Sequence, residues 1–179
     1  LLKLLEPGSY DYLFTAEAKS IPLIHEMARQ SGAKKYFIAR KGPKAYMPDP
    51  IHVEDQSITT AGTQKLYLGR DDADLIRGKR IVLMDDVIST GGSVLDAVDA
   101  LREAGAEVLG VVSIFTYGMK KGVERLAAAQ VRNVSLTDLD TVASTGAQEG
   151  YITEADVARL LAFRENPSDE SWIRAESQV

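Results

Sequence analysis

Residues 80–93 read RIVLMDDVISTGGS and constrain the fold more than any other part of the sequence. The apolar run at 81–84 is typical of a strand buried on both faces of a parallel sheet. It ends in two adjacent carboxylates, Asp85 and Asp86, and a loop rich in hydroxyl groups and glycine then leads into a helical pattern. This order predicts anionic oxygens at the carboxyl end of a strand and N–H and O–H donors at the start of a helix. A ligand that satisfies both halves carries a diol and a phosphate, as a sugar phosphate does.

The rest of the chain predicts an α/β fold. Strands that alternate with helices indicate right-handed βαβ units and a mostly parallel sheet flanked by helices. Helices are expected to end at Gly32 and Gly105, and residues 153–156 resemble a capping box that starts a helix near the C-terminus. We expect strands at 12–15, 36–39, 65–68, 81–84, 108–115 and 134–136, helices at 21–30, 94–101 and 123–129, and a short acidic turn or helix at 71–76.

The pattern divides the chain into a core at 1–130 and a helical C-terminal extension at 131–179 that packs on the core. Residues 41–63 contain several glycines and prolines without a sustained period. Such a long excursion predicts a flexible, functional loop. The chain opens on Leu1 rather than methionine, so we expect that a native N-terminal segment is missing.

The composition argues against several classes of protein. The 179 residues carry a net charge of −5, which is unsuited to general nucleic-acid binding through many cationic phosphate contacts. There is no cysteine, so a disulfide framework and a thiolate site are excluded. No apolar run approaches the roughly 18 residues of a membrane-spanning helix. We expect a cytoplasmic protein with neither a nucleic-acid partner nor a membrane partner.

An acidic pair alone can simply complement the dipole at the start of a helix. Here the loop of Ser89, Thr90, Gly91, Gly92 and Ser93 follows it, and the combination is far more specific than either part. The loop lacks the Gly-Lys-Ser/Thr triplet of a Walker A motif and the G-x-G-x-x-G fingerprint of a dinucleotide site.

Residues 82–93 resemble the phosphoribosyl-pyrophosphate signature of type I phosphoribosyltransferases, nearly position by position. The resemblance implies the Rossmann-like sheet of that family. It also implies that Asp85 and Asp86 are catalytic, hold the ribose hydroxyls, and approach a Mg²⁺ ion carried by phosphoribosyl pyrophosphate. The loop would wrap the 5-phosphate. The implied donor-binding residues are Asp85, Asp86, Val87, Ile88, Ser89, Thr90, Gly91, Gly92 and Ser93.

Two upstream segments extend the resemblance. Residues 15–23 resemble the first active-site loop of adenine-type phosphoribosyltransferases, whose backbone N–H groups bind pyrophosphate. Residues 39–44 resemble the second and flexible loops of that group. Between Lys34 and Lys44 there are five cations and no acid, which suits a departing pyrophosphate; a basic face that aids solubility is the alternative, and Lys19 has a similar alternative as a solvated lysine. The implied pyrophosphate-binding residues are Glu17, Ala18, Lys19, Ser20, Arg40, Lys41 and Lys44, of which Lys44 is also expected to be catalytic.

Residues 45–62 are expected to form a lid over this site. The ribosyl centre is cationic in such reactions, and a closed loop would exclude the water that hydrolyses it. Residues 59–62 fit a return hairpin equally well.

The core and the tail resemble enzymes that act on different bases. Residues 10 to about 115 resemble adenine phosphoribosyltransferases, whereas 115–118, 136–139, 149–153 and 163–167 resemble some orotate phosphoribosyltransferases. The lysine- and histidine-containing catalytic loop of the orotate enzymes has no clear match between residues 40 and 62. The active-site loops lie nearer to the chemistry than the tail does, so they carry more weight.

We therefore expect a glycosyltransferase of the pentosyltransferase class that moves phosphoribose from phosphoribosyl pyrophosphate to a nucleobase and releases pyrophosphate. Adenine, and hence purine salvage, is the first choice; orotate, and hence pyrimidine biosynthesis, is the second. The alternative from another class is a regulatory protein that binds phosphoribosyl pyrophosphate without catalysis. The resemblance also implies a homodimer.

Overall fold

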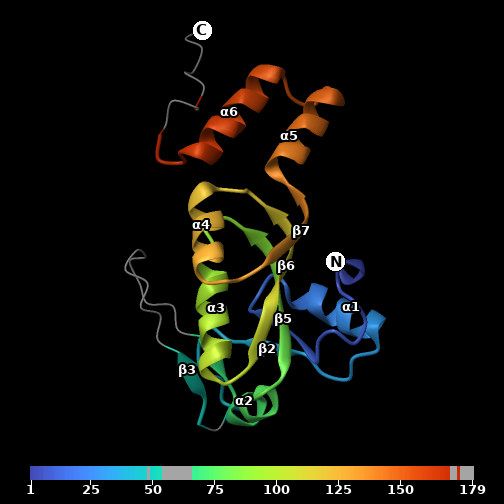
Figure 1. Ribbon diagram of the computed structural model, residues 1–179, viewed down its shortest axis with the longest axis vertical. Helices are drawn as coiled ribbons and strands as arrows, with labels where there is room; N and C mark the ends of the chain where they lie inside the picture. Colours follow the sequence, from blue (N-terminus) through green and yellow to red (C-terminus); the bar gives the residue numbers. More distant parts are fainter. Residues whose placement is uncertain (48, 54–65, 170–172, 174–179) are drawn as a thin grey trace.

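The computed structural model describes residues 1–47, 49–53, 66–169 and 173. Its centre is a five-stranded sheet with the order β2-β1-β5-β6-β7 (Figure 1), and all neighbouring strands run parallel. The strands are β1 (Tyr12–Ala16), β2 (Phe37–Ala39), β5 (Arg80–Ile88), β6 (Glu107–Thr116) and β7 (Asn133–Asp138). A second, antiparallel pair consists of β3 (Ile51–Val53) and β4 (Leu66–Leu68). The predicted α/β fold with a parallel sheet is confirmed.

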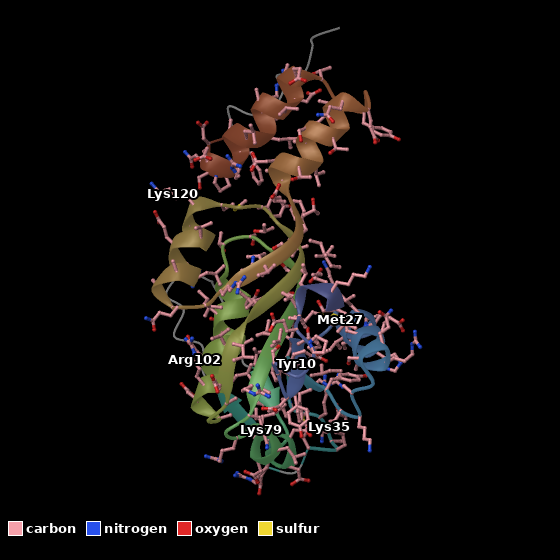
Figure 2. All side chains as sticks on the ribbon, turned by 45° about the vertical axis from the view of Figure 1, so that its right-hand side comes forward. Tyr10, Met27, Lys35, Lys79, Arg102 and Lys120 are labelled. Atoms are coloured by element: carbon pink, nitrogen blue, oxygen red, sulfur yellow. The ribbon has the colours of Figure 1, made fainter. Side chains whose placement is uncertain are left out.

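Helices cover both faces of the sheet, as Figure 1 shows. On one face lies α1 (Ile21–Ser31); on the other lie α3 (Gly92–Glu103) and α4 (Lys120–Ala128), with α2 (Arg70–Ile76) near the end of the sheet. Figure 2 places Met27 of α1 and Arg102 of α3 on opposite sides. Leu13 and Phe14 are adjacent in β1 but belong to the two different core clusters, because successive side chains of a strand point to opposite faces. This explains why the strands of the core read as continuous apolar runs.

The direction in which the chain builds the sheet reverses between β1 and β5. From β1 the chain passes through α1 to β2 on one side, whereas from β5 it passes through α3 and α4 to β6 and β7 on the other. Ligands of open parallel sheets bind outside the carboxyl ends of the strands at such a reversal. The topology therefore places the expected site between the ends of β1 and β5.

The two strands separate at this point. β1 pairs with β5 only as far as Phe14 and Leu83, whereas β6 pairs with β5 through Ile88. The buried hydroxyl of Thr15 donates to the carbonyl oxygen of Met84 at 2.8 Å and so adds one last link. The strand predicted at 81–84 is thus too short: it continues through the acidic pair to Ile88, because β6 still provides a partner there.

The C-terminal part forms a helical hairpin of α5 (Leu139–Gln148) and α6 (Glu154–Glu165) beyond the end of β7 (Figure 1). The capping box at Thr153 and Asp156 is confirmed. Helix α5, which begins at an Asp138 cap, was not among the expected helices. The domain division at residue 130 stays a prediction; β7, which lies beyond it, is part of the main sheet. Every helix in the described part of the chain is too short or too polar to cross a bilayer.

Candidate active site

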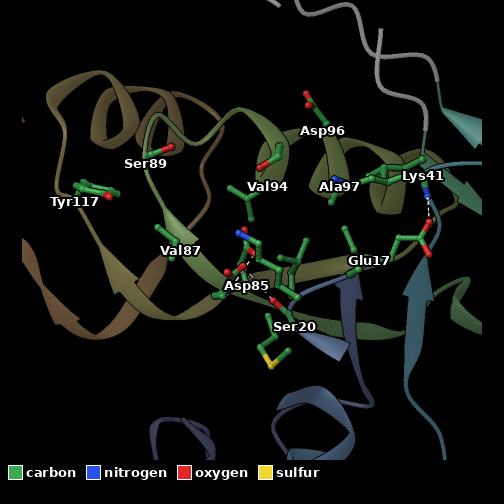
Figure 3. Close-up of a pocket in the computed structure, with 18 residues that line it drawn as sticks. Glu17, Ser20, Lys41, Asp85, Val87, Ser89, Val94, Asp96, Ala97 and Tyr117 are labelled. Atoms are coloured by element: carbon green, nitrogen blue, oxygen red, sulfur yellow. Dashed lines mark hydrogen bonds between the residues drawn. The ribbon is translucent and has the colours of Figure 1, made fainter. Parts of the chain in front are cut away.

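A cavity of about 520 Å³ lies at the carboxyl ends of β1 and β5 (Figure 3). It brings together most of the residues predicted from sequence. Those that line it are Glu17, Ala18, Lys19, Ser20, Lys41, Asp85, Asp86, Val87, Ser89 and Ser93. Some predicted residues do not line it: Arg40 and Lys44 from residues 34–44, which we call the basic segment, and Ile88, Thr90, Gly91 and Gly92 from the end of β5 and the loop after it.

The acidic pair forms part of the cavity wall. Asp85 Oδ1 accepts a hydrogen bond from the backbone N–H of Asp86 at 2.9 Å, and Asp86 Oδ1 accepts one from the Ser20 hydroxyl at 3.4 Å. Burial, together with the side-chain contact to Asp86, raises the pKa of Asp85 to about 7. In the free protein near neutral pH, Asp85 therefore exists partly as the neutral acid, and a bound cation would favour release of its proton.

Glu17, in the turn after β1, fixes the basic segment beside the cavity. Its carboxylate accepts from the backbone N–H of Lys41 at 2.7 Å and pairs with Arg40 at 3.2 Å and Lys44 at 3.4 Å. Burial by itself would raise the pKa of Glu17, but these three partners outweigh it and lower the pKa below its ordinary value. Because the carboxylate has these partners, it organises the cations instead of repelling an anion.

The cations near the cavity have different roles. Lys35 pairs with Asp72 at 2.8 Å and lies over the Phe37 ring, 5.0 Å from its centroid, so its role is structural. Lys41 and the exposed Lys19 line the cavity. Figure 3 shows Lys41 and Tyr117 at opposite ends of the cavity with Asp85 between them. The cavity therefore has a cationic end, an acidic middle and an aromatic end.

Helix α4 supports the loop after β5 from outside. Gly91 ends the loop in a left-handed conformation, with φ at +75°. A Cβ atom at Gly122 would overlap the backbone carbonyl oxygen of Ser89, so α4 packs directly on the loop only because residue 122 has no side chain. Arg125 Nη1 also donates to the carbonyl oxygen of Thr90 at 3.5 Å. This support was not predicted, because the expected helix began at residue 123 and left Gly122 outside it, whereas the structure places Gly122 within α4.

Other lining residues also escaped sequence reasoning. Val94, Asp96 and Ala97 come from the first turns of α3, and Tyr117 follows β6. Asp96 gave little signal in the sequence, because Asp99 and Glu103 also lie among the apolar positions of the same helix. For Tyr117 the signal was an aromatic residue directly after a parallel strand, at the edge where the other strands carry their polar residues.

The described residues offer a divalent metal two adjacent carboxylates, and no group of three or more His, Asp or Glu side chains converges among them. Mg²⁺ is usually held by one or two protein carboxylates together with substrate phosphates and water. Asp85 and Asp86 fit a metal ion that arrives with an oxygen-rich ligand.

The predicted lid at 45–62, within the loop at 41–63, lies largely outside the described residues. Among its described residues, β3 (Ile51–Val53) pairs with β4. The alternatives for residues 59–62 fall entirely outside the described part. The lid therefore stays a prediction.

The chain is similar in sequence to phosphoribosyltransferases. Residues 3–148 match the model of the phosphoribosyl transferase domain. The orotate phosphoribosyltransferase of Bacillus cytotoxicus is 50% identical over 99 residues, which cover 55% of this chain and 47% of that protein. The chain thus spans about half the length of the curated relatives it matches.

Solved structures share the fold. The adenine phosphoribosyltransferase of Thermoanaerobacter pseudethanolicus superposes with a TM-score of 0.62 at 22% identity, covering 76% of this chain and 74% of that one. The orotate phosphoribosyltransferase of Aeropyrum pernix gives a TM-score of 0.54 at 21% identity, covering 82% and 68%. The names of these two proteins specify different bases, so likeness of fold alone does not select a base.

Proposed function

Because the chain belongs to the phosphoribosyl transferase domain family, we propose that it transfers phosphoribose from phosphoribosyl pyrophosphate to a nucleobase and releases pyrophosphate. The bond between C1′ and a pyrophosphate oxygen breaks, and pyrophosphate leaves with the bonding electrons. A ring nitrogen of the base bonds to C1′ and gives up its N–H proton to solvent. The observation that carries the proposal is the order of groups along the cavity: cations, paired carboxylates, then an aromatic wall.

We assign each part of the donor to residues in or beside the cavity. Asp85 and Asp86 accept hydrogen bonds from the ribose hydroxyls, the loop at 89–93 receives the 5-phosphate at the start of α3, and Lys19 and Lys41 face the pyrophosphate. Mg²⁺ carried by the donor and approached by the acidic pair would neutralise the leaving group. The protein's own contribution is positioning and preorganised charge.

The base is proposed to lie at the aromatic end. Tyr117 lines that end, and Val87 lines the same cavity with 41% of its surface exposed. A planar base can pack on such a surface. Orotate is the base that we would test first, because the curated relatives that are 48–50% identical over 99 residues are named orotate phosphoribosyltransferases. Adenine is second, and the resemblance of the active-site loops supports it.

Pyrophosphate release with orotate, adenine, hypoxanthine, guanine and xanthine tests the proposal. We expect one base to support turnover far above the others in the presence of Mg²⁺. Donor binding without turnover on any base would contradict the proposed activity and favour the regulatory alternative. The homodimer is likewise a proposal, and light scattering on the eluting protein would test it.

Lys44→Ala is expected to lower turnover more than donor affinity. Lys44 Nζ pairs with Glu17 and does not line the cavity, so it makes no contact that holds the bound donor. We propose that Lys44 approaches the leaving pyrophosphate only as the loop at 41–63 closes. We expect kcat to fall about tenfold or more, as for one lost electrostatic contact in a transition state, with the donor Kd within about twofold. The matched control is Lys34→Ala, an exposed lysine of the same segment. Equal losses in kcat and affinity would refute this role.

Donor binding is expected to weaken below about pH 7. The pKa of Asp85 is raised to about 7, so below that pH a Mg²⁺-bound donor must displace its proton, which costs up to about tenfold in affinity per pH unit. The same group makes the folded state less stable as pH rises from its ordinary pKa of 3.8 to about 7, because the folded state keeps a proton that the unfolded state has released. Calorimetry at about pH 6 and about pH 8 measures the change in donor affinity. A pH dependence of the affinity that persists in Asp85→Asn would rule out Asp85 as its source.

A further inference from the structure

The C-terminal helical hairpin reaches the cavity through one aromatic side chain. Phe163 of α6 lies edge-on to Tyr117, with ring centroids 6.2 Å apart and ring planes at 75°. Tyr117 in turn lies edge-on to Phe115 of β6, at 5.0 Å and 86°. Since Tyr117 lines the cavity, three rings form a continuous path from the cavity wall to a helix outside the sheet.

The backbone that carries Tyr117 is fixed to the neighbouring strand. The N–H of Tyr117 donates to the carbonyl oxygen of Ile88 at 2.9 Å, and the N–H of Gly118 donates to the Thr116 hydroxyl at 3.1 Å. With its backbone held in this way, the position of the Tyr117 ring depends on rotation of the side chain. Phe115 and Phe163 border the ring and restrict that rotation.

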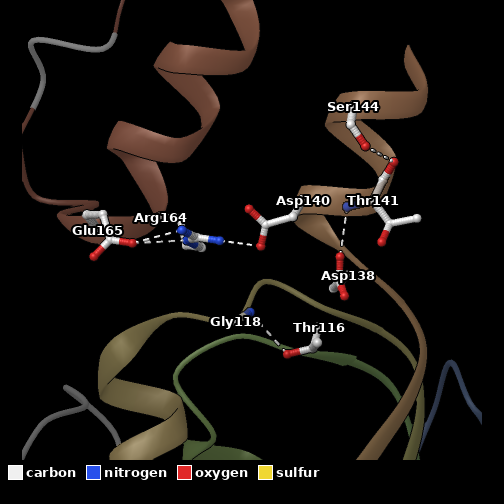
Figure 4. Close-up of polar contacts among 8 residues, drawn as sticks. All are labelled: Thr116, Gly118, Asp138, Asp140, Thr141, Ser144, Arg164 and Glu165. Atoms are coloured by element: carbon white, nitrogen blue, oxygen red, sulfur yellow. Dashed lines mark hydrogen bonds and ion pairs between the residues drawn. The ribbon is translucent and has the colours of Figure 1, made fainter. Parts of the chain in front are cut away.

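Polar contacts hold α6 over this loop, as Figure 4 shows. Arg164, the residue after Phe163, forms ion pairs with Asp140 of α5 and, at 3.0 Å, with Glu165. Asp138 caps α5 by accepting from the N–H of Thr141 at 2.8 Å. Because α5 is fixed at its start and Arg164 joins α6 to it, Phe163 is presented to Tyr117 from a supported position.

Helix α6 contributes little to the core, so the contact between Phe163 and Tyr117 is not explained by packing of the interior. None of its residues is buried, so the helix is not needed to fill the interior of the sheet. The aromatic contact to Tyr117 instead connects it to the cavity wall. The groups assigned to the donor lie elsewhere, on the turn after β1, the end of β5 and the loop before α3.

We propose that Phe163 is a positioning residue for the base: through Tyr117 it sets the shape of the cavity end opposite Lys41. This inference rests on the proposed function, since it concerns base recognition in the same site. It assigns the C-terminal hairpin a role in choosing and holding the base, separate from holding the donor.

The test compares ligands with and without a base. Calorimetry measures the affinity for orotidine monophosphate, AMP and ribose 5-phosphate; the ratio of nucleotide to ribose 5-phosphate affinity reports the base alone. We expect Phe163→Ala to lower that ratio about three- to tenfold for the nucleotide that binds better, with ribose 5-phosphate affinity within about twofold, in line with the loss of one aromatic contact. Phe163→Tyr, which keeps the ring, should restore it.

Two further variants separate positioning from general damage. Tyr151→Ala, on the same hairpin and 80% exposed, should leave both affinities unchanged. Tyr117→Ala should reproduce the effect of Phe163→Ala, and the double variant should add little, because the two residues act as one unit. An unchanged ratio in Phe163→Ala, parallel losses for nucleotide and ribose 5-phosphate, or full additivity would each overturn the inference. Turnover by the unaltered protein tests the proposed function separately, so the two failures are distinguishable.

Discussion

The double variant Asp85→Asn with Asp86→Asn is expected to lose binding of phosphoribosyl pyrophosphate while keeping its fold. The two carboxylates form the middle of the cavity wall, and amides there can neither attract Mg²⁺ nor accept charge-assisted hydrogen bonds from the ribose. Each such bond contributes about 1.5–3 kcal/mol, so removing both should weaken binding by at least about a hundredfold. The fold should survive, because burial already disfavours the charge on Asp85, as its raised pKa shows.

The control for this variant removes the same two charges elsewhere. Asp71 and Asp72 are adjacent in the first turn of α2, and Asp72 forms a half-exposed ion pair with Lys35 of a kind that contributes little to stability. Asp71→Asn with Asp72→Asn should therefore leave donor affinity within about twofold. Calorimetry and thermal unfolding measure both variants, and an unchanged donor affinity in the cavity variant would remove the basis for assigning the acidic pair.

Gly122→Ala is expected to impair donor binding severely although it adds a single methyl group. The new Cβ would overlap the carbonyl oxygen of Ser89, and backbone cannot move aside as the end of a flexible side chain can. The loop at 89–93 must shift, which costs on the order of 1–3 kcal/mol in stability and disturbs the N–H groups assigned to the 5-phosphate. We expect the donor KM to rise about tenfold or more and the Tm to fall by several degrees.

Gly146→Ala is the matched control for that substitution. Gly146 is also a helical glycine, in α5, but a Cβ there would meet the side chain of Ile152 at 3.4 Å, a contact that a side chain can relieve. The gain in helix propensity, about 1 kcal/mol, is the same at both positions. A Gly122→Ala protein with the Tm and donor KM of the Gly146→Ala protein would show that α4 does not support the loop.

The sequence predicted correctly those elements whose residues are close together in the chain. The apolar run at 81–84, the loop after it and the spacing of Val94, Val98 and Leu101 are each contained within one strand–loop–helix unit, and the structure places them as expected. The bounds of β5 depended on a neighbour, since β6 pairs with it through Ile88. Helix α5 starts at its Asp138 cap, and its apolar residues, Leu139, Val142, Ala143 and Ala147, lie at helical spacing. They are mostly small and are separated by Asp, Thr and Ser, and only Leu139 and Ala143 are buried.

The parts of the candidate site that sequence reasoning missed are long-range contacts. Glu17 meets Arg40 and Lys44 only because β1 and β2 are adjacent in the sheet. Its carboxylate is a partner of cations, while pyrophosphate binding by the backbone of this turn stays a prediction. Tyr117 and Phe163 likewise come together only once α6 has folded back over the end of β6. No spacing along the chain encodes either contact.

The separation of β1 from β5 has a mechanical consequence. Three residue pairs, from Tyr12 with Ile81 to Phe14 with Leu83, and the hydrogen bond from Thr15 to Met84 join these strands. The boundary between β1 and β5 divides the sheet into a two-strand side and a three-strand side. A donor that contacts the turn after β1 on one side and the end of β5 on the other would hold the two sides of the sheet together. The bound donor would then contribute to the stability of the sheet. The Tm should be higher with the donor bound than without it, because the ligand binds only the folded chain.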